Sequence, residues 1–439
     1  MVTFLSLFLW LINGTQPVKV AVDPAVVSVE IFLDGERIGV ATEPYWEIKC
    51  DFGARLRPHE LVAVARDDAG RDVGRAVQLV NLPRAAAEVG IVFDGGSPDA
   101  PSTLRVVTES TERLEPLAVF VTFDGLMARE VGGGHFEIPS HDPRQTHIVS
   151  AEAHFPEGVT ARRDVTFSGA FGGGVATELT AVPVILEDRR DVTTQELRGL
   201  LRARGEALIV AAVERPGGRV YMVRDYGAWL SMSGMGARLD KQNRSARLGF
   251  SKYVARIGQG ARAIDEIPPG KDRFCLVVPN PDRARGLAIF PLARPFSIQQ
   301  WGLPWLATHV RTPLSSMPDQ RLADAIAVAG VRAAADGCPR TVVLVLGHEG
   351  TDHSDFSPAA VREYLRTLHV PLAVWSTETD NLHTLWGEAV DVDGVSRLGK
   401  ASRRMLTDLH RQWIVWVEGS LLPHEIELAE NDKGIRLVE

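Results

Sequence analysis

Thr341-Val-Val-Leu-Val-Leu346 and Val370-Pro-Leu-Ala-Val-Trp375 are two continuous apolar runs, each with the length of a buried strand. Between them, Ser357-Pro358 places a helix-capping side chain directly before a proline suited to the first helical turn. Val361 and Leu365 then recur at the spacing of one helix face. Apolar strands joined by a helix are typical of a parallel sheet that helices cover on both faces. This stretch therefore predicts a doubly wound α/β domain.

The same alternation of strands and helices extends on both sides of this stretch. Two further helical faces are expected, over 250–264 and 322–333. Three more apolar runs have strand length and are expected to join the sheet: Val220–Val223, Phe274–Val278 and Ile414–Val417. We assign residues 190–420 to the α/β domain and residues 421–439 to a C-terminal tail.

The N-terminal part of the chain has the pattern of strands and contains an internal repeat. Val29–Gly35 recurs as Val119–Gly125, and His59–Ala65 recurs as His147–Ala153 at nearly the same offset. Each copy contains alternating apolar positions and an Asp-Gly turn, and closes on a strand that ends in proline. We therefore expect two tandem all-β, Ig-like sandwiches, over residues 17–84 and 85–185.

Composition excludes several classes of protein. The 439 residues carry a formal net charge of −8, with 45% hydrophobic and 24% charged residues, which is the balance of a folded protein. The chain has no long basic run, so no nucleic-acid partner is expected. Cys50, Cys275 and Cys338 are widely spaced, which excludes a disulfide framework and a cysteine-based zinc site. Its glycine-rich stretches lack phosphate-loop and dinucleotide spacing, and no cofactor is expected.

Residues 1–16 form an apolar N-terminal segment. Val2–Ile12 is too short to span a bilayer but has the length of a signal-peptide core. The segment lacks a basic start and a cleavage site, and a buried first strand is the alternative interpretation. We expect a signal remnant and an extracytoplasmic protein, periplasmic or secreted, whose membrane contact is at most through this segment.

Residues 205–418 resemble the von Willebrand factor type A-related domains of acidobacterial-type secreted proteins. The resemblance rests on the order of the elements, on the runs quoted above, on Gly347-His-Glu-Gly350 and on Leu322-Ala-Asp-Ala-Ile-Ala327. It implies a bacterial, secreted module for protein binding or adhesion. In that family, an Asp-x-Ser-x-Ser motif, a Thr and a further Asp hold a divalent cation at the carboxyl ends of the strands, because such cations prefer oxygen ligands.

The metal ligands implied by this resemblance are largely replaced. The motif after the first strand is Asp225-Tyr-Gly-Ala-Trp229, which keeps the Asp and loses both hydroxyl groups. Gln320 stands at the Thr position, and His348 stands at the position of the second Asp. We therefore expect a degenerate metal-ion-dependent adhesion site that holds no metal. The expected binding residues lie in the loops at the strand ends: Asp225, Tyr226, Trp229, Asp319, Gln320, His348, Glu349 and Asp352.

Three functions stay open at this stage. The first is a non-enzymatic, extracytoplasmic protein-interaction or adhesion module whose protein partner is unknown. The second is a structural spacer or scaffold of a secreted or envelope assembly, with the tandem sandwiches as spacers. The third is a metal-dependent hydrolase that uses the loop of His348, Glu349 and His353, although this spacing is not that of HExxH.

Overall fold

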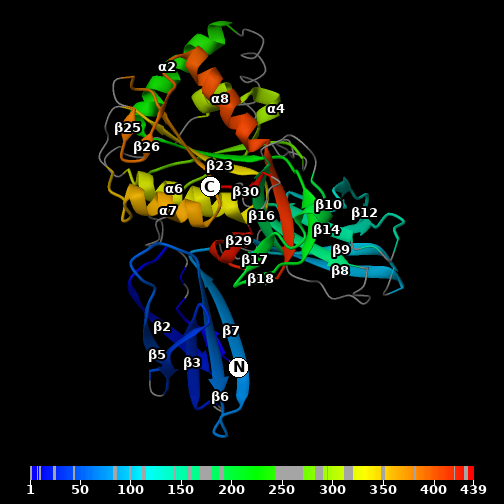
Figure 1. The fold of residues 1–439 in the computed structure, drawn as a ribbon. Helices are drawn as coiled ribbons and strands as arrows, with labels where there is room; N and C mark the ends of the chain where they lie inside the picture. Colours follow the sequence, from blue (N-terminus) through cyan, green and yellow to red (C-terminus); the bar gives the residue numbers. More distant parts are fainter. Residues whose placement is uncertain are drawn as a thin grey trace.

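A computed structural model describes most of the chain. The described residues form two all-β sandwiches, a small β unit that joins distant parts of the sequence, and an α/β unit (Figure 1). Among them, no helix combines the length and the apolar character needed to cross a membrane. The described residues are 2–6, 8, 11–22, 26–42, 45–82, 87–97, 100–110, 115–142, 145, 147–155, 160–167, 179–186, 192–242, 270–281, 290–293, 295–310, 320–347, 352–379, 382–419, 421–429 and 434–439.

The first sandwich packs a three-stranded sheet against a four-stranded sheet. Its strands are β1 (Val2–Phe4), β2 (Thr15–Val22), β3 (Ser28–Leu33), β4 (Glu36–Ala41), β5 (Glu47–Asp51), β6 (His59–Arg66) and β7 (Asp72–Val80). The sheets have the orders β1-β2-β5 and β4-β3-β6-β7. Val29, Ile31 and Leu61 are buried in the core between the sheets, because side chains two residues apart share one face of a strand.

The apolar N-terminal segment belongs to this first sandwich. β1 pairs antiparallel with β2, so that Val2 lies opposite Val22 and Phe4 lies opposite Val20. Val2 and Phe4 are buried in the sandwich core. The sandwich therefore begins at β1 rather than at residue 17, and the segment that we expected to be a signal remnant supplies a buried strand.

The second sandwich has two four-stranded sheets, with the orders β11-β10-β14-β15 and β12-β13-β9-β8. Its core contains Leu104, Val121 and Val149. Its strands are β8 (Ala87–Ser97), β9 (Ala100–Ser110), β10 (Ala118–Phe123), β11 (Leu126–Met127), β12 (Glu130–Gly132), β13 (His135–Glu137), β14 (His147–His154) and β15 (Thr160–Phe167).

The internal repeat has a structural reason. In the first sandwich, Asp34 Oδ2 lies 2.8 Å from His59 Nδ1, and Asp34 Oδ1 accepts a hydrogen bond of 2.9 Å from the backbone N–H of Glu60. In the second sandwich, Asp124 and His147 make the same two contacts at 2.7 and 2.9 Å. Both aspartates have positive φ, 52° and 48°, a conformation that Asp tolerates better than most residues. The repeat therefore specifies a turn aspartate that binds the start of the neighbouring strand.

The strand expected to close the second sandwich lies in another unit. β16 (Leu179–Leu186) pairs antiparallel with β28 (Gln412–Glu418) on one side and with β30 (Ile435–Leu437) on the other. β19 (Val210–Glu214) completes a sheet of the order β19-β28-β16-β30. The second sheet of this unit has the order β18-β17-β29. The remaining elements of the unit are β17 (Leu201–Ala203), β18 (Glu206–Ala207), β29 (Ile426–Leu428), α1 (Thr194–Leu197) and the short 3-10 helix η5 (Pro423–Glu425).

This small β unit corrects three of our expectations. Within the described residues, the strands of the second sandwich end with β15 rather than at residue 185. Ile414–Val417 lies in the antiparallel β28 and not in the parallel sheet. The C-terminal tail is not an appendage, because it forms β29 and β30. The physical cause is a shared core in which Val184 and Val415 are fully buried together.

The α/β unit lies in the sequence between β19 and β28. Its sheet has the order β22-β21-β20-β23-β24-β27, and every pair in it is parallel except β21 with β22. Its strands are β20 (Arg219–Arg224), β21 (Arg273–Val277), β22 (Phe296–Ser297), β23 (Arg340–Leu346), β24 (Leu372–Ser376) and β27 (Val390–Asp391), with a separate hairpin of β25 (His383–Thr384) and β26 (Gly387–Glu388).

Helices cover both faces of this sheet (Figure 1). One face packs against α6 and α7, and the other packs against α2, α5 and α8. The predicted helix over 322–333 corresponds to α6, and Ser357 caps α7 by accepting a hydrogen bond from Ala360 N. The helical face predicted over 250–264 lies outside the described residues. The helices are α2 (Tyr226–Gln242), α4 (Ile298–Trp301), α5 (Leu303–His309), α6 (Leu322–Ala335), α7 (Pro358–Thr367) and α8 (Val395–Leu409).

Candidate functional site

The candidate site lies where the parallel strands β20 and β23 end. The chain leaves β20 into α2 on one face of the sheet and reaches α7 on the other face after β23. In open α/β sheets, ligands bind at the carboxyl ends of strands whose connections diverge in this way. Asp225 follows β20 and Gly347 follows β23 at this position.

Asp225 is the central acidic residue of the site, and both of its carboxylate oxygens accept hydrogen bonds from backbone N–H groups. Its Oδ1 accepts a hydrogen bond of 2.6 Å from Ala228 N, and its Oδ2 accepts one of 2.7 Å from Gly347 N. Burial raises the pKa of Asp225 to about 6, and the negative charge of Glu378 acts in the same direction, while the backbone N–H groups oppose the shift. The carboxylate therefore binds the start of α2 to the end of β23.

Gln320 and Asp352 also lie at this edge, and both stabilise backbone. Gln320 Oε1 accepts a hydrogen bond of 3.0 Å from Tyr226 N, and the Gln320 carbonyl accepts one of 2.8 Å from His353 N. Asp352 Oδ1 accepts a hydrogen bond of 2.8 Å from Leu322 N, at the start of α6. A carboxylate at this position satisfies an N–H group that the helix leaves without a partner. The structure thus brings Asp225, Tyr226 and Gln320 together.

Beside the exposed polar residues Asp352 and His353, part of the site's surface is apolar. The rings of Tyr226 and Trp229, on the first turn of α2, have centroids 5.5 Å apart, and both side chains are half-buried. The adjacent Leu230 is 50% exposed. We call Tyr226, Trp229 and Leu230 the strand-end surface. Leu230 was not among our expected site residues, because the sequence analysis predicted no helix over this segment.

Three expected site residues, Asp319, His348 and Glu349, lie outside the described residues. Within the described part of the chain, no group of three His, Cys, Asp or Glu side chains could hold a metal ion. The sequence analysis also missed Gly347 and Glu378, which act on Asp225. Gly347 follows β23 directly and Glu378 lies two residues after the end of β24, and these positions are the signal that could have found them.

Comparisons with known proteins find several similar solved structures. No family model and no curated protein matches the chain. One similar solved structure is that of the fibronectin(III)-like modules of Clostridium thermocellum CbhA, with 17% identity and a TM-score of 0.17 over 18% of this chain and 93% of that chain. Another is the central fibronectin-III array of RIM-binding protein, with 12% identity and a TM-score of 0.21 over 46% of this chain and 81% of that chain. A β-glucuronidase from glycoside hydrolase family 2 matches at 16% identity and a TM-score of 0.19, over 38% of this chain and 20% of that one.

The strand pairing itself defines the coarse class, a chain with all-β, Ig-like sandwiches. Identities and TM-scores at this level carry no argument about activity or partners. None of the reported matches supports the resemblance to von Willebrand factor type A domains.

The titration of Asp225 predicts a pH-dependent stability. Because its pKa is raised in the folded protein, the protonated carboxyl stabilises the fold below pH 4, and this contribution is lost as the pH rises to about 6. The contribution is about 3 kcal/mol. Asp225→Asn removes it, so the stability of the variant relative to the native chain should rise between pH 4 and 6. Urea unfolding at several pH values measures this difference, and parallel pH profiles would contradict the prediction.

Proposed function

We propose that the chain is a non-enzymatic protein-interaction module that acts outside the cytoplasm and binds a protein partner through the strand-end surface. The α/β unit would be a von Willebrand type A-like domain with a degenerate metal site. One observation carries the proposal: at the end of β20, where open α/β sheets bind their ligands, the Asp225 carboxylate accepts hydrogen bonds from two backbone N–H groups and lies beside an apolar surface.

Two further features support the binding role. Tyr and Trp side chains are enriched in protein interfaces, because each offers a large, rigid contact area together with a polar tip. Asp225 also fixes the first turn of α2, so Tyr226 and Trp229 are held in place before a partner arrives. A preorganised surface loses less entropy when it binds.

A structural scaffold is the second candidate, and one contact favours it. Arg273 Nη1, at the start of β21, lies 2.6 Å from Glu152 Oε1 in β14 of the second sandwich. Both side chains are buried. A buried ion pair between two units restrains their relative orientation, which is what a spacer needs. The two candidates differ in whether the strand-end surface has a partner.

A capture experiment tests the proposal. The immobilised full-length chain is exposed to envelope and secreted protein fractions of the source organism, with EDTA or with millimolar Mg²⁺. Leu230→Glu is the test variant. Leu126→Glu is the matched control, because Leu126 is 74% exposed on the second sandwich. We expect a protein that the native chain and the control retain and that Leu230→Glu loses, with about tenfold weaker affinity once that protein is purified.

The outcomes separate the parts of the proposal. Equal capture by all three forms would refute the strand-end surface as the binding site and favour the scaffold. Capture that requires Mg²⁺ and is abolished by EDTA would show that the metal site is not degenerate.

A further inference from the structure

The edge of the parallel sheet at β24 is only partly paired. β24 pairs with β23 from Leu372 to Ser376, but on its other side β27 pairs only with Trp375 and Ser376. Within the described residues, no strand lies beside Leu372 and Val374 on that side. Unpaired strand edges can template the addition of another strand.

The hydrogen bonds of β24 determine which backbone groups face this open edge. The Pro371 carbonyl accepts a hydrogen bond from Val342 N, and the Leu346 carbonyl accepts one from Thr377 N. The backbone polar groups of residues 371 and 377 therefore face β23. The Ser376 carbonyl accepts from Val392 N on the other side. Because backbone groups alternate along a strand, the N–H and C=O of Leu372 and the N–H of Val374 point to the open edge.

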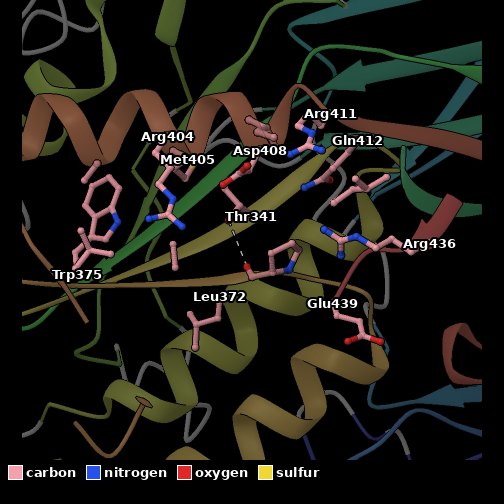
Figure 2. Close-up of a pocket in the computed structure, with 16 residues that line it drawn as sticks. Thr341, Leu372, Trp375, Arg404, Met405, Asp408, Arg411, Gln412, Arg436 and Glu439 are labelled. Atoms are coloured by element: carbon pink, nitrogen blue, oxygen red, sulfur yellow. Dashed lines mark hydrogen bonds between the residues drawn. The ribbon is translucent and has the colours of Figure 1, made fainter. Parts of the chain in front are cut away.

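A cavity of about 320 Å³ lies along the same edge, as Figure 2 shows. Its walls come from β24, from α8 and from the small β unit, so that three distant parts of the sequence enclose it. Apolar side chains line its interior, among them Ala373, Trp375, Met405 and Leu409. Trp375 and Leu409 are almost fully buried. An apolar side chain of a bound molecule would therefore leave water at this position.

Charged side chains flank the cavity. Figure 2 places Arg404 and Arg436 on opposite sides of it, with Thr341 and Leu372 between them. Neither guanidinium has an ion pair or hydrogen bond to the described part of the chain, and both are exposed. Arg411 lies at the rim as well, together with the carboxylates of Asp408 and Glu439, which leaves an excess of one positive side chain.

We propose that this edge binds an extended peptide, which adds to the sheet as a strand beside Leu372 and Val374. An apolar side chain of the peptide enters the cavity, and acidic side chains two positions before and after it pair with Arg404 and Arg436. Residues two apart share a face of a strand, so one face of the peptide supplies all three side chains. Backbone pairing supplies affinity, and the cavity supplies specificity. This site lies toward the amino end of β24, apart from the strand-end surface.

A fluorescent peptide tests the proposal with the full-length chain. The probe is fluorescein-labelled Glu-Thr-Leu-Thr-Glu with an amidated end, and fluorescence polarisation at low salt measures its dissociation constant. Two modified probes carry N-methyl groups, either on both threonines or on the leucine and the second glutamate. Only one edge of a bound strand faces β24, so we expect one modified probe to lose at least tenfold in affinity and the other to bind nearly as the parent.

Charge reversal supplies the matched variants. Arg404→Glu and Arg436→Glu are each expected to weaken binding about fivefold to tenfold. Arg403→Glu changes the net charge equally but lies outside the cavity lining on α8, so it should bind the probe as the native chain does. Thermal unfolding verifies that all three variants are folded.

Several results would overturn the proposal. Equal binding of both N-methylated probes would mean that side chains alone are recognised and that no strand is added. If Arg403→Glu and Arg404→Glu weakened binding of the probe equally, the effect would come from net charge and not from a contact with Arg404. Self-association of the chain that the probe cannot displace would assign the edge to a second copy. No saturable binding of the parent probe at millimolar concentration would also refute the peptide.

Discussion

Replacing Glu152 with alanine is expected to lower the free energy of unfolding by about 3–5 kcal/mol. Glu152 lies in β14, and its carboxylate is the negative partner of two buried arginines at the starts of β20 and β21. Its Oε1 lies 2.6 Å from Arg273 Nη1, and its Oε2 lies 3.8 Å from Arg219 Nη2. His154 Nε2 lies 2.6 Å from the same Oε1. The substitution would leave both guanidinium groups buried without this partner.

The protonation of Glu152 supports this expectation. Burial alone would raise the pKa of its carboxyl, but the charge of Arg273, the hydrogen bond with His154 and the charge of Arg219 hold the pKa well below its usual value. The group is therefore charged at neutral pH despite its burial. Removing one partner of a buried ion pair costs far more than the pair itself contributes, because an uncompensated charge remains.

Chemical denaturation measures the effect, and two variants control it. Glu137→Ala removes a carboxylate that pairs with Arg129 at 2.7 Å on the surface, where it is 48% exposed, and should cost no more than about 1 kcal/mol. Glu152→Gln keeps a hydrogen-bond acceptor in place and should cost less than alanine. A stability of Glu152→Ala within 1 kcal/mol of the native chain would show that water or a rearranged side chain compensates the two arginines.

This ion pair also shows where sequence analysis stops. Arg219 and Arg273 stand at the beginning of apolar strands of the α/β unit, and Glu152 stands in a strand of the second sandwich whose sequence alternates between apolar and polar residues. From the sequence, each of these three charged residues would be assigned to a solvated position on a strand. Their contact depends on how two separate units pack, and no local period in the sequence carries that information. The prediction that Ile414–Val417 joins the parallel sheet was wrong for a similar reason, because an apolar run identifies a buried strand but not its pairing partner.

The features that could be predicted are those with a local cause. The cap at Ser357 and the helical stripe of α6 follow from nearest neighbours along the chain, and both are confirmed. The Asp34 and Asp124 turns were visible as a repeat, although their histidine contacts were not. At the strand ends, the resemblance to von Willebrand factor type A domains implied that Asp225 and Gln320 lie close together, and Gln320 does accept a hydrogen bond from Tyr226 N. Only the structure shows that Asp225 binds the backbone of Gly347.

Gly347→Ala is expected to lower the free energy of unfolding by about 3 kcal/mol or more. A β-carbon at this position would overlap the backbone atoms of Gly227 and Ala228 at the start of α2. Backbone atoms cannot rotate away as the end of a flexible side chain can, so the end of β23 and the first turn of α2 would have to separate. That separation would also break the hydrogen bond from residue 347 to Asp225.

Gly234→Ala is the matched control for this substitution. Gly234 lies within α2 and is exposed, and a β-carbon there would meet nothing within 4 Å. Because alanine favours a helix over glycine, this variant should be more stable than the native chain by about 0.5–1 kcal/mol. A glycine-to-alanine substitution would therefore lower the free energy of unfolding at Gly347, which packs against the start of α2, and raise it at Gly234, which lies within α2. A stable Gly347→Ala chain with an unchanged capture profile would mean that the junction of β20, β23 and α2 can open, and that the strand-end surface is not held in place by Asp225.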